Sequence, residues 1–265
     1  MLKISNLNKY FNLNTINEVK VLDNINLNVN KTDFITIIGS NGAGKSTLFN
    51  CIAGSILADS GSIILDQNDI TYKKEYLRSK MIGRLFQNPL QGSAPNMTIE
   101  ENLALAYLRG DSSRNSFSMI TNSDRLFFKE KLKELNLDLD NSLNQKVGTL
   151  SGGQRQALSL LMATIVTPKL LLLDEHTAAL DPQTAKTVMD LTDDIVSKNK
   201  ITCLMITHNL NHAIKYGNRI LMMEKGRIVL DLDNKENITI DNLLDRFKKE
   251  TGKLLDNDRI LLSSE

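Results

Sequence analysis

Apolar and polar residues alternate along two stretches near the start of the chain, 2–11 and 19–29. Alternation with a period of two predicts strands with one buried face, so these stretches are expected to pair in an antiparallel sheet. Mostly apolar runs follow at 34–38, 170–173 and 202–206, of which the run at 170–173 is unbroken. Such runs predict strands buried on both faces, as in the middle of a parallel sheet.

Helical patterns lie between these strands. Thr98 and Glu101 have the spacing of a capping box, which predicts a helix running to about Arg109. A long apolar helix is expected from Ser151, with Pro168 ending it. The remaining expectations are strands at 62–65 and 82–86, a hairpin of 219–223 with 227–232, helices at 74–81, 126–135 and 183–196, a helix capped by Asp241, an exposed loop over 110–122 and a poorly ordered tail from Asp256.

A glycine-rich loop joins the first buried run to a helix. Its residues are Gly39, Ser40, Asn41, Gly42, Ala43, Gly44, Lys45, Ser46 and Thr47. Backbone N–H groups of such a loop can point at phosphate oxygens, and the following helix adds its positive end. Lys45 can reach the β- and γ-phosphates, and Ser46 can ligate Mg²⁺. The strand-loop-helix context therefore predicts a nucleotide-binding P-loop and not a plain turn.

These elements predict an α/β fold. We expect a P-loop NTPase core with a mostly parallel sheet, an N-terminal antiparallel β subdomain and an α-helical subdomain. Residues 1–87 and 166–265 are assigned to the core with the antiparallel strands, and 88–165 to the helical subdomain. Proline, glycine and serine break regular structure over 87–97, which predicts a hinge between the two parts.

Polar residues follow the ends of several predicted elements. Ser151 is placed to cap a helix, which would make a second anion site, although such a turn alone is more often structural. Asp174 and Glu175 end a buried strand, where carboxylates suit Mg²⁺ and an attacking water. His208 follows the next buried strand on the same predicted edge, although a lone histidine is usually structural.

Two other patterns have simpler explanations. Tyr10 and Phe11 end the first strand, where either ring could stack on adenine or pack on the sheet. Asn30-Lys-Thr-Asp33 matches a guanine-reading pattern, but it precedes the P-loop, so we interpret it as a turn.

Composition limits the classes of protein. With 265 residues, of which 41% are hydrophobic and 24% charged, the chain can bury a full core. A net charge of +1 gives no bias toward nucleic acid. Cys51 and Cys203 lie in apolar elements and are expected as buried, reduced thiols. No apolar run approaches the ~18 residues that span a bilayer, and the N-terminus lacks a signal-peptide core, so a cytoplasmic protein is expected.

The order of these motifs resembles the ATP-binding cassette (ABC) ATPase family. The resemblance reaches from the N-terminus to about Leu232 and depends on the P-loop, Gln87, Leu150 to Gln154, Leu170 to Glu175, Leu180-Asp181 and His208. The Ser-Gly-Gly-Gln sequence that starts at Ser151 separates this family from other P-loop enzymes. A P-loop kinase or GTPase would not explain it.

The resemblance implies a role for each matching residue. It implies that Glu175 is the general base, that His208 senses the γ-phosphate and that Gln87 contacts Mg²⁺ and water. ATP and Mg²⁺ are the implied cofactors. ATP would contact Phe11, the P-loop residues 39–47, Ser151, Gly152, Gly153, Gln154 and Asp181, and the metal would be held by Ser46, Gln87 and Asp174.

The resemblance also implies partners. ATP would close a head-to-tail homodimer, with Ser151 and Gly153 of one chain covering ATP held by Lys45 of the other. A separate membrane permease would hold the chain peripherally at the inner face of the membrane. A solute-binding protein would act indirectly through the permease, with import as the expected direction. Leu90 and Met97 are candidates to line a groove for the permease, and either could equally belong to the core of the helical subdomain.

Two positions depart from the common family pattern. His176 stands where most relatives have proline, and Ala178 where serine is common. This variant resembles a subset of cassettes that pair with a permease and a solute-binding lipoprotein, with amino acids as candidate substrates. The alternative is a soluble cassette ATPase acting in ribosome, DNA or cofactor-assembly work. The sequence lacks both the second cassette of the ribosomal type and the long coiled coil of the DNA-repair type.

Overall fold

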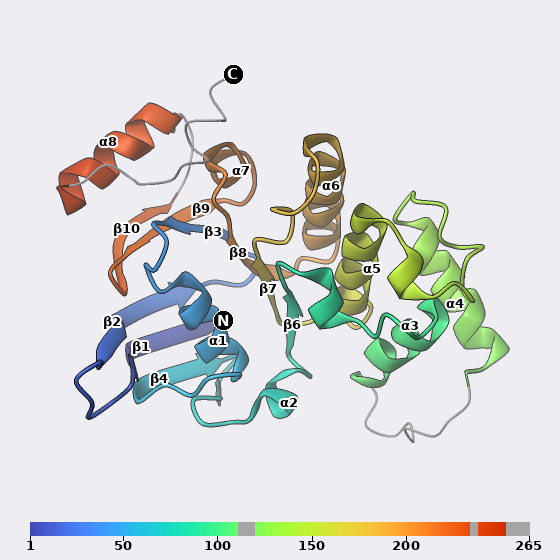
Figure 1. Ribbon diagram of the computed structural model, residues 1–265, viewed down its shortest axis with the longest axis horizontal. Coiled ribbons are helices and arrows are strands. Elements are labelled where there is room, and N and C mark those ends of the chain that lie inside the picture. The colour runs from blue at the N-terminus through green and yellow to red at the C-terminus, as the bar shows by residue number, and fades with distance from the viewer. Residues whose placement is uncertain (111–119, 234–237, 253–265) are drawn as a thin grey trace. The chain divides into compact units, whose positions relative to one another are not determined.

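The computed structural model describes residues 1–110, 120–233 and 238–252 and divides into two compact units (Figure 1). The first unit combines residues 1–78 with residues 202–265, and the second holds residues 79–201. Most of the loop expected over 110–122, and the whole tail from Asp256, lie outside the described residues. The division into core and helical subdomain stays a prediction.

An antiparallel sheet forms part of the first unit. Its strands are β1 (Leu2–Phe11), β2 (Val19–Val29), β4 (Ser60–Leu65) and β5 (Asn68–Asp69), in the order β2-β1-β4-β5. From Ile25 to Val29 the apolar side chains are buried and the asparagines between them are exposed. The predicted pairing of the first two strands is confirmed, because the alternating pattern suits a sheet with one buried face.

The same unit contains a mostly parallel set of strands. They are β3 (Phe34–Gly39), β8 (Thr202–Ile206), β9 (Arg219–Glu224) and β10 (Arg227–Asp233). Strand β3 runs parallel to β8 and β9, and β10 returns antiparallel to β9 as the predicted hairpin. All residues of β3 and β8 are buried, as their mostly apolar sequences predict. The helices of this unit are α1 (Lys45–Ala53), α2 (Glu75–Arg78), α7 (Leu210–Lys215) and α8 (Ile240–Thr251).

Helix α8 has a different cap from the one predicted. The hydroxyl of Thr239 accepts a hydrogen bond of 3.2 Å from the N–H of Asn242, so Thr239 is the N-cap. The prediction that Asp241 caps this helix is wrong, because Asp241 already lies in the first turn. Its negative charge still stabilises the helix, because it lies near the positive N-terminal end of the helix dipole.

The second unit combines four α-helices and two 3₁₀ turns with a parallel strand pair in its described residues. Its elements are β6 (Ile82–Leu85), the 3₁₀ turn η1 (Pro89–Gly92), α3 (Ile99–Leu108), α4 (Asn122–Lys133), η2 (Val147–Thr149), α5 (Gly152–Thr164), β7 (Leu170–Asp174) and α6 (Pro182–Lys198). Both predicted caps are confirmed, since Thr98 and Ser151 each form a capping box with the residue three positions on. Apolar side chains of α3, α4 and α5 pack into one core.

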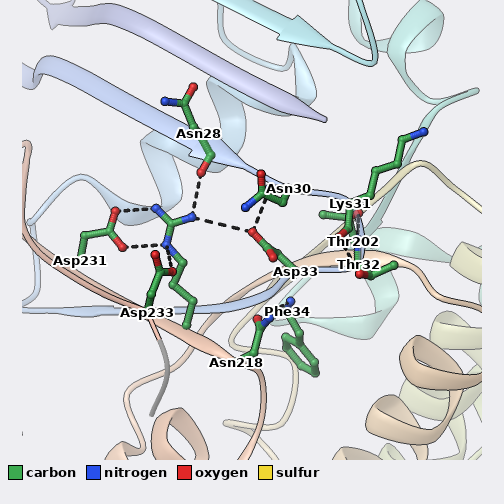
Figure 2. Close-up of polar contacts among 11 residues, drawn as sticks. Asn28, Asn30, Lys31, Thr32, Asp33, Phe34, Thr202, Asn218, Asp231 and Asp233 are labelled. Carbon is green, nitrogen blue, oxygen red and sulfur yellow. Dashed lines mark hydrogen bonds and ion pairs between the residues drawn. The ribbon is translucent and has the colours of Figure 1, made fainter.

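The Asn30–Asp33 segment forms the turn between β2 and β3, as predicted (Figure 2). The N–H of Asn30 donates to the carboxylate of Asp33 at 2.8 Å. The Arg219 guanidinium lies 3.8 Å from the same carboxylate and donates at 2.8 Å to the carbonyl oxygen of Asn28. It also pairs with Asp231 of β10. Asp33 therefore joins strand ends within the unit, and the likeness to a guanine-reading motif is coincidental.

Two expectations from composition are met in the described residues. Cys51 and Cys203 are buried and form no disulfide. Burial raises the pKa of the Cys51 thiol to about 11 and also raises the pKa of Cys203, so both stay protonated. A membrane-crossing helix is absent from the described parts of the chain, because none of their helices is both long and apolar enough.

Candidate functional site

The P-loop connects β3 to α1 through a left-handed glycine. Gly44 is the N-cap of α1, with φ 98° and ψ 4°. A Cβ at this position would lie 2.7 Å from the carbonyl oxygen of Val21, so any larger residue would displace the backbone. The N–H groups of Ser46 and Thr47, in the first turn, have no partner within the helix and can bind an anion.

The Lys45 side chain folds back over this loop. Its ammonium donates hydrogen bonds of 2.7 Å to the carbonyl oxygen of Gly39 and 2.9 Å to that of Ser40. The side chain is buried, with 6% of its surface exposed. The loop therefore holds a positive charge beside its own open N–H groups, which is a phosphate-binding arrangement.

The other end of α1 is held by a buried arginine. The Arg78 guanidinium is fully buried and donates to the carbonyl oxygens of Cys51 at 2.7 Å and Ile52 at 2.9 Å. These carbonyls belong to the last turn of α1, where a positive charge complements the helix dipole. Arg78 therefore fixes the helix whose first turn follows the P-loop.

His208 lies at the same sheet edge as the P-loop. Strands β3 and β8 run parallel with Ile37 opposite Ile206, and the N–H of Thr207 donates to the Ile37 carbonyl oxygen at 3.1 Å. His208 follows directly, and the P-loop starts at the end of β3. Because parallel strands end at one edge, the first unit brings together two of the predicted site elements.

Phe11 is the more accessible of the two aromatic candidates. Its exposed fraction is 37%, whereas Tyr10 is partly buried. The ammonium of Lys9 lies 5.8 Å from the centre of the Phe11 ring and pairs with Asp59 at 3.0 Å. An exposed ring that is anchored from one side suits stacking on a base.

In the second unit, Ser151 forms the capping box of α5. Its hydroxyl oxygen accepts a hydrogen bond of 3.2 Å from the N–H of Gln154, and the Gln154 side chain accepts one of 3.1 Å from the N–H of Ser151. The hydroxyl proton of Ser151 is not used in this box. With the N–H groups of Gly152 and Gly153, it gives a rigid set of donors at an exposed helix end.

The structure places Asp181 beside this motif. Asp181 caps α6, and its carboxylate accepts a hydrogen bond of 3.0 Å from the N–H of Thr184. Hydrogen bonds from the Thr184 side chain and from this N–H lower the pKa of Asp181. A Cβ on Gly153 would lie 2.3 Å from the Thr184 methyl group. Only glycine therefore allows α5 to approach the first turn of α6, which brings two predicted nucleotide contacts together.

Asp174, Glu175 and Gln87 share the C-terminal edge of the β6–β7 pair. Leu85 pairs with Leu173 in this parallel ladder, so Gln87 and Glu175 each lie two residues beyond paired positions. The Asp174 carboxylate lies 3.9 Å from the Arg84 guanidinium. Sequence reasoning missed Arg84, because its position opposite the acidic strand follows from the strand register.

Glu175 has an unusual backbone conformation. Its φ is 46°, in the left-handed region that residues with a Cβ rarely adopt. The N–H of Ala178 donates to the Glu175 carbonyl oxygen at 3.0 Å, which closes the turn after β7. Such strain costs on the order of 1–3 kcal/mol and is concentrated at functional sites.

The His176 side chain packs against α6. Its Nε2 lies 3.2 Å from the Thr192 hydroxyl, which itself donates to the carbonyl oxygen of Val188 at 2.7 Å. Because the hydroxyl proton is used there, His176 must be the donor to Thr192. With 3% of its surface exposed, His176 is packed inside the unit next to Glu175.

We expect His176→Pro to keep ATP hydrolysis within about threefold of the wild-type rate, because the imidazole packs on α6 and the family that the sequence resembles commonly has proline at this position. Hydrolysis by purified protein, with unfolding temperature as a second measurement, tests this. A loss of hydrolysis of about 100-fold or more, the size expected for removing a general base, would give His176 a direct catalytic role.

A hollow of about 400 Å³ lies within the second unit. It is lined by residues of β6, η1, α3 and α5, among them Arg84, Phe86, Pro89, Leu105, Arg109 and Met162. Leu105 is 53% exposed, although Leu103 on the same helix is fully buried. An apolar residue on the polar side of an amphipathic helix is the sequence signal that could have identified it.

The two groove candidates chosen from sequence stay a prediction, because the described residues show no contact with a permease. Neither Leu90 nor Met97 lines this hollow. In the short 3₁₀ turn η1, Pro89, Gln91 and Gly92 line it and Leu90 does not, because residues of such a turn face different directions. The apolar residues of 87–97 do not show by themselves which side chains of this segment line the hollow.

Comparisons with known proteins all find ATP-binding proteins of transporters. Residues 22–178 match the family described as ABC transporter. The tyrosine transport ATP-binding protein of Clostridioides difficile (strain R20291) is 45% identical over 94% of this chain and 99% of that protein. The phosphonates import ATP-binding protein PhnC 2 of Oceanobacillus iheyensis is 36% identical over 87% of this chain and 89% of its own length.

Solved structures agree with the expected fold. The ADP conformation of MJ1267, an ATP-binding cassette of an ABC transporter, has a TM-score of 0.75 and 31% identity, covering 92% of this chain and 94% of the other. A dimeric post-hydrolysis state of the cassette MJ0796, bound to ADP and Pi, has a TM-score of 0.74 and 28% identity, covering 88% and 98%. The predicted α/β P-loop fold is confirmed.

Proposed function

This chain belongs to the ABC transporter family and is an ATP-binding, ATP-hydrolysing subunit, and we propose that it powers import by a separate membrane permease. The observation that carries the proposal is the Ser151 capping box on α5. The P-loop is common to many NTPases, whereas an exposed Ser-Gly-Gly donor set on a second helix suits closure over a nucleotide held by another chain.

The proposed ATP site assigns a task to each predicted residue. The P-loop residues 39–47 hold the phosphates, with Lys45 on the β- and γ-phosphates, and Phe11 stacks on the adenine. Glu175 accepts the proton of the attacking water, while Gln87 and His208 orient the water and the γ-phosphate. Ser151, Gly152, Gly153, Gln154 and Asp181 complete the site from the other chain of the dimer.

Mg²⁺ fits the oxygen atoms that these residues offer. We assign it to the Ser46 hydroxyl, the Asp174 carboxylate and the Gln87 side chain, with nucleotide phosphates as the remaining ligands. Mg²⁺ is commonly bound by one or two protein groups plus phosphates and water. The metal would neutralise charge on the phosphates.

We base the proposed substrate on the tyrosine transport protein of Clostridioides difficile. At 45% identity over nearly its whole length, the tyrosine transport protein supports an amino acid, with tyrosine as the first substrate to test. Uptake of labelled tyrosine by cells that lack this chain should fall and return on complementation. Phosphonate uptake, suggested by a relative at 36% identity, serves as the comparison. Loss of phosphonate uptake alone would overturn the amino acid assignment.

We propose that the hollow beside Leu105 receives a cytoplasmic segment of the permease. This contact would place the chain at the inner face of the membrane, with a solute-binding protein acting through the permease. The hollow offers an exposed leucine and a phenylalanine next to two arginines. Apolar side chains with a polar rim are typical of a partner surface.

Leu105→Glu tests this surface. We expect association with the membrane fraction to fall at least about tenfold and uptake to stop, because a buried carboxylate opposes an apolar contact. ATP hydrolysis by the isolated chain should stay unchanged, since Leu105 lies outside the proposed nucleotide contacts.

Leu126→Glu is the matched control. Leu126 is 65% exposed on α4 and does not line the hollow, so this variant should bind membranes normally. Equal loss in both variants would point to a general defect. If the wild-type chain associates with no membrane protein in its own cells, the soluble alternative replaces the transporter proposal.

A further inference from the structure

We propose that Glu224 is a positioning residue for the P-loop, acting through Ser40 on Lys45. The proposal rests on the ATP site proposed above and adds a residue that none of the motifs identified. Glu224 ends β9, 184 positions away from Ser40 in the sequence. All the contacts involved lie within the first unit.

The β9–β10 hairpin packs directly on the P-loop. Strand β9 pairs with β3 so that Met223 stands opposite Gly39, the first P-loop residue. The hairpin turn follows at Lys225 and Gly226, with φ 46° and 77°. The N–H of Gly226 donates to the carbonyl oxygen of Ala43 at 3.0 Å, so the hairpin contacts the loop near both of its ends.

Ser40 links the hairpin to the lysine. Its hydroxyl donates a hydrogen bond to the Glu224 carboxylate. Its carbonyl oxygen accepts the 2.9 Å hydrogen bond from the Lys45 ammonium. The orientation of Ser40 therefore determines its hydrogen bonds to both Glu224 and Lys45. By fixing Ser40, Glu224 determines the position of the carbonyl oxygen that accepts from Lys45.

The task of Glu224 is geometric and not electrostatic. A carboxylate near the P-loop repels nucleotide phosphates, so its charge alone would weaken binding. A hydrogen bond that restricts a glycine-rich loop has the opposite effect, because it removes conformational freedom that binding would otherwise have to remove. We infer that the second effect is larger.

The test is a double-mutant cycle with Glu224→Ala and Ser40→Ala. Each single variant should raise the KM for ATP about fivefold to tenfold, a factor within the range expected for losing one ordinary intramolecular hydrogen bond, and leave kcat within about twofold. The double variant should be no worse than either single variant, because both remove the same contact. Additive effects would overturn the proposal.

Two further variants separate positioning from other roles. Glu224→Gln keeps an oxygen that can accept the Ser40 hydrogen bond, so it should restore most of the wild-type KM. Arg227→Ala breaks the contact of the same hairpin with Asp23 and leaves Ser40 untouched, so its KM should stay normal. Equal impairment in Glu224→Gln and Glu224→Ala would contradict a geometric role.

Stability measurements complete the test. Unfolding temperatures of the single variants should stay within about 2 °C of the wild type, since one partly buried contact is removed. A lower unfolding temperature with unchanged KM would make the contact merely structural and overturn the proposal. If the wild-type chain itself fails to bind ATP, the proposed ATP site fails. If the wild type binds and hydrolyses ATP normally and Glu224→Ala and Ser40→Ala both have the wild-type KM, the role of Glu224 is rejected and the proposed ATP site stands.

Discussion

Replacement of Glu175 by glutamine is expected to lower steady-state ATP hydrolysis by at least about 100-fold while ATP binding is retained, because general-base catalysis contributes at least that factor. The amide keeps the shape and polarity of the carboxylate but cannot accept the proton of the attacking water. The left-handed backbone at Glu175 and the Ala178 hydrogen bond should persist, since both involve only the main chain.

Retained binding should also trap the ATP-bound dimer. Size-exclusion chromatography with ATP and Mg²⁺ should show a stable dimer for Glu175→Gln and a transient one for the wild type. Asp194→Asn is the matched control, since Asp194 is an exposed carboxylate on α6 that pairs with Lys198 at 3.6 Å and lies outside the proposed nucleotide contacts. A Glu175→Gln variant that is inactive yet always monomeric would contradict the assignment.

Mixing two inactive variants is expected to restore hydrolysis. Lys45→Ala removes the P-loop ammonium, and Ser151→Arg replaces the hydroxyl of the capping box with a bulky cation. In a head-to-tail dimer each ATP site needs Lys45 from one chain and Ser151 from the other. A mixed dimer therefore has one intact site and one site with both defects.

The size of the recovery follows from random pairing. At equal concentrations half the dimers are mixed, so about a quarter of the wild-type sites should be intact and activity should recover to about that level. Hydrolysis by the wild type should also rise with protein concentration. If mixtures stay inactive while each variant folds and dimerises, sites shared between chains are excluded.

Sequence patterns predicted those features of the structure that depend on contacts between residues close together in the chain. The capping boxes at Thr98 and Ser151 join residues three positions apart, so the side chains that make them can be recognised without knowing the fold. The P-loop is equally local, since its strand, glycines and lysine are contiguous. The prediction for α8 failed within two residues, because Thr239 and Asp241 are both able to cap and only the backbone decides which one does.

Contacts between residues far apart in the chain could not be recognised from a sequence pattern. The Glu224–Ser40 contact joins residues 184 positions apart, and Arg84 approaches Asp174 because of the register between β6 and β7. Leu105 and Leu90 are both exposed leucines, yet only Leu105 lines the hollow. Periodicity and capping determined the strands, the helix starts and the phosphate-binding loop, because these depend on neighbouring residues. Strand register and helix packing decided which distant side chains meet, because these depend on the whole folded chain.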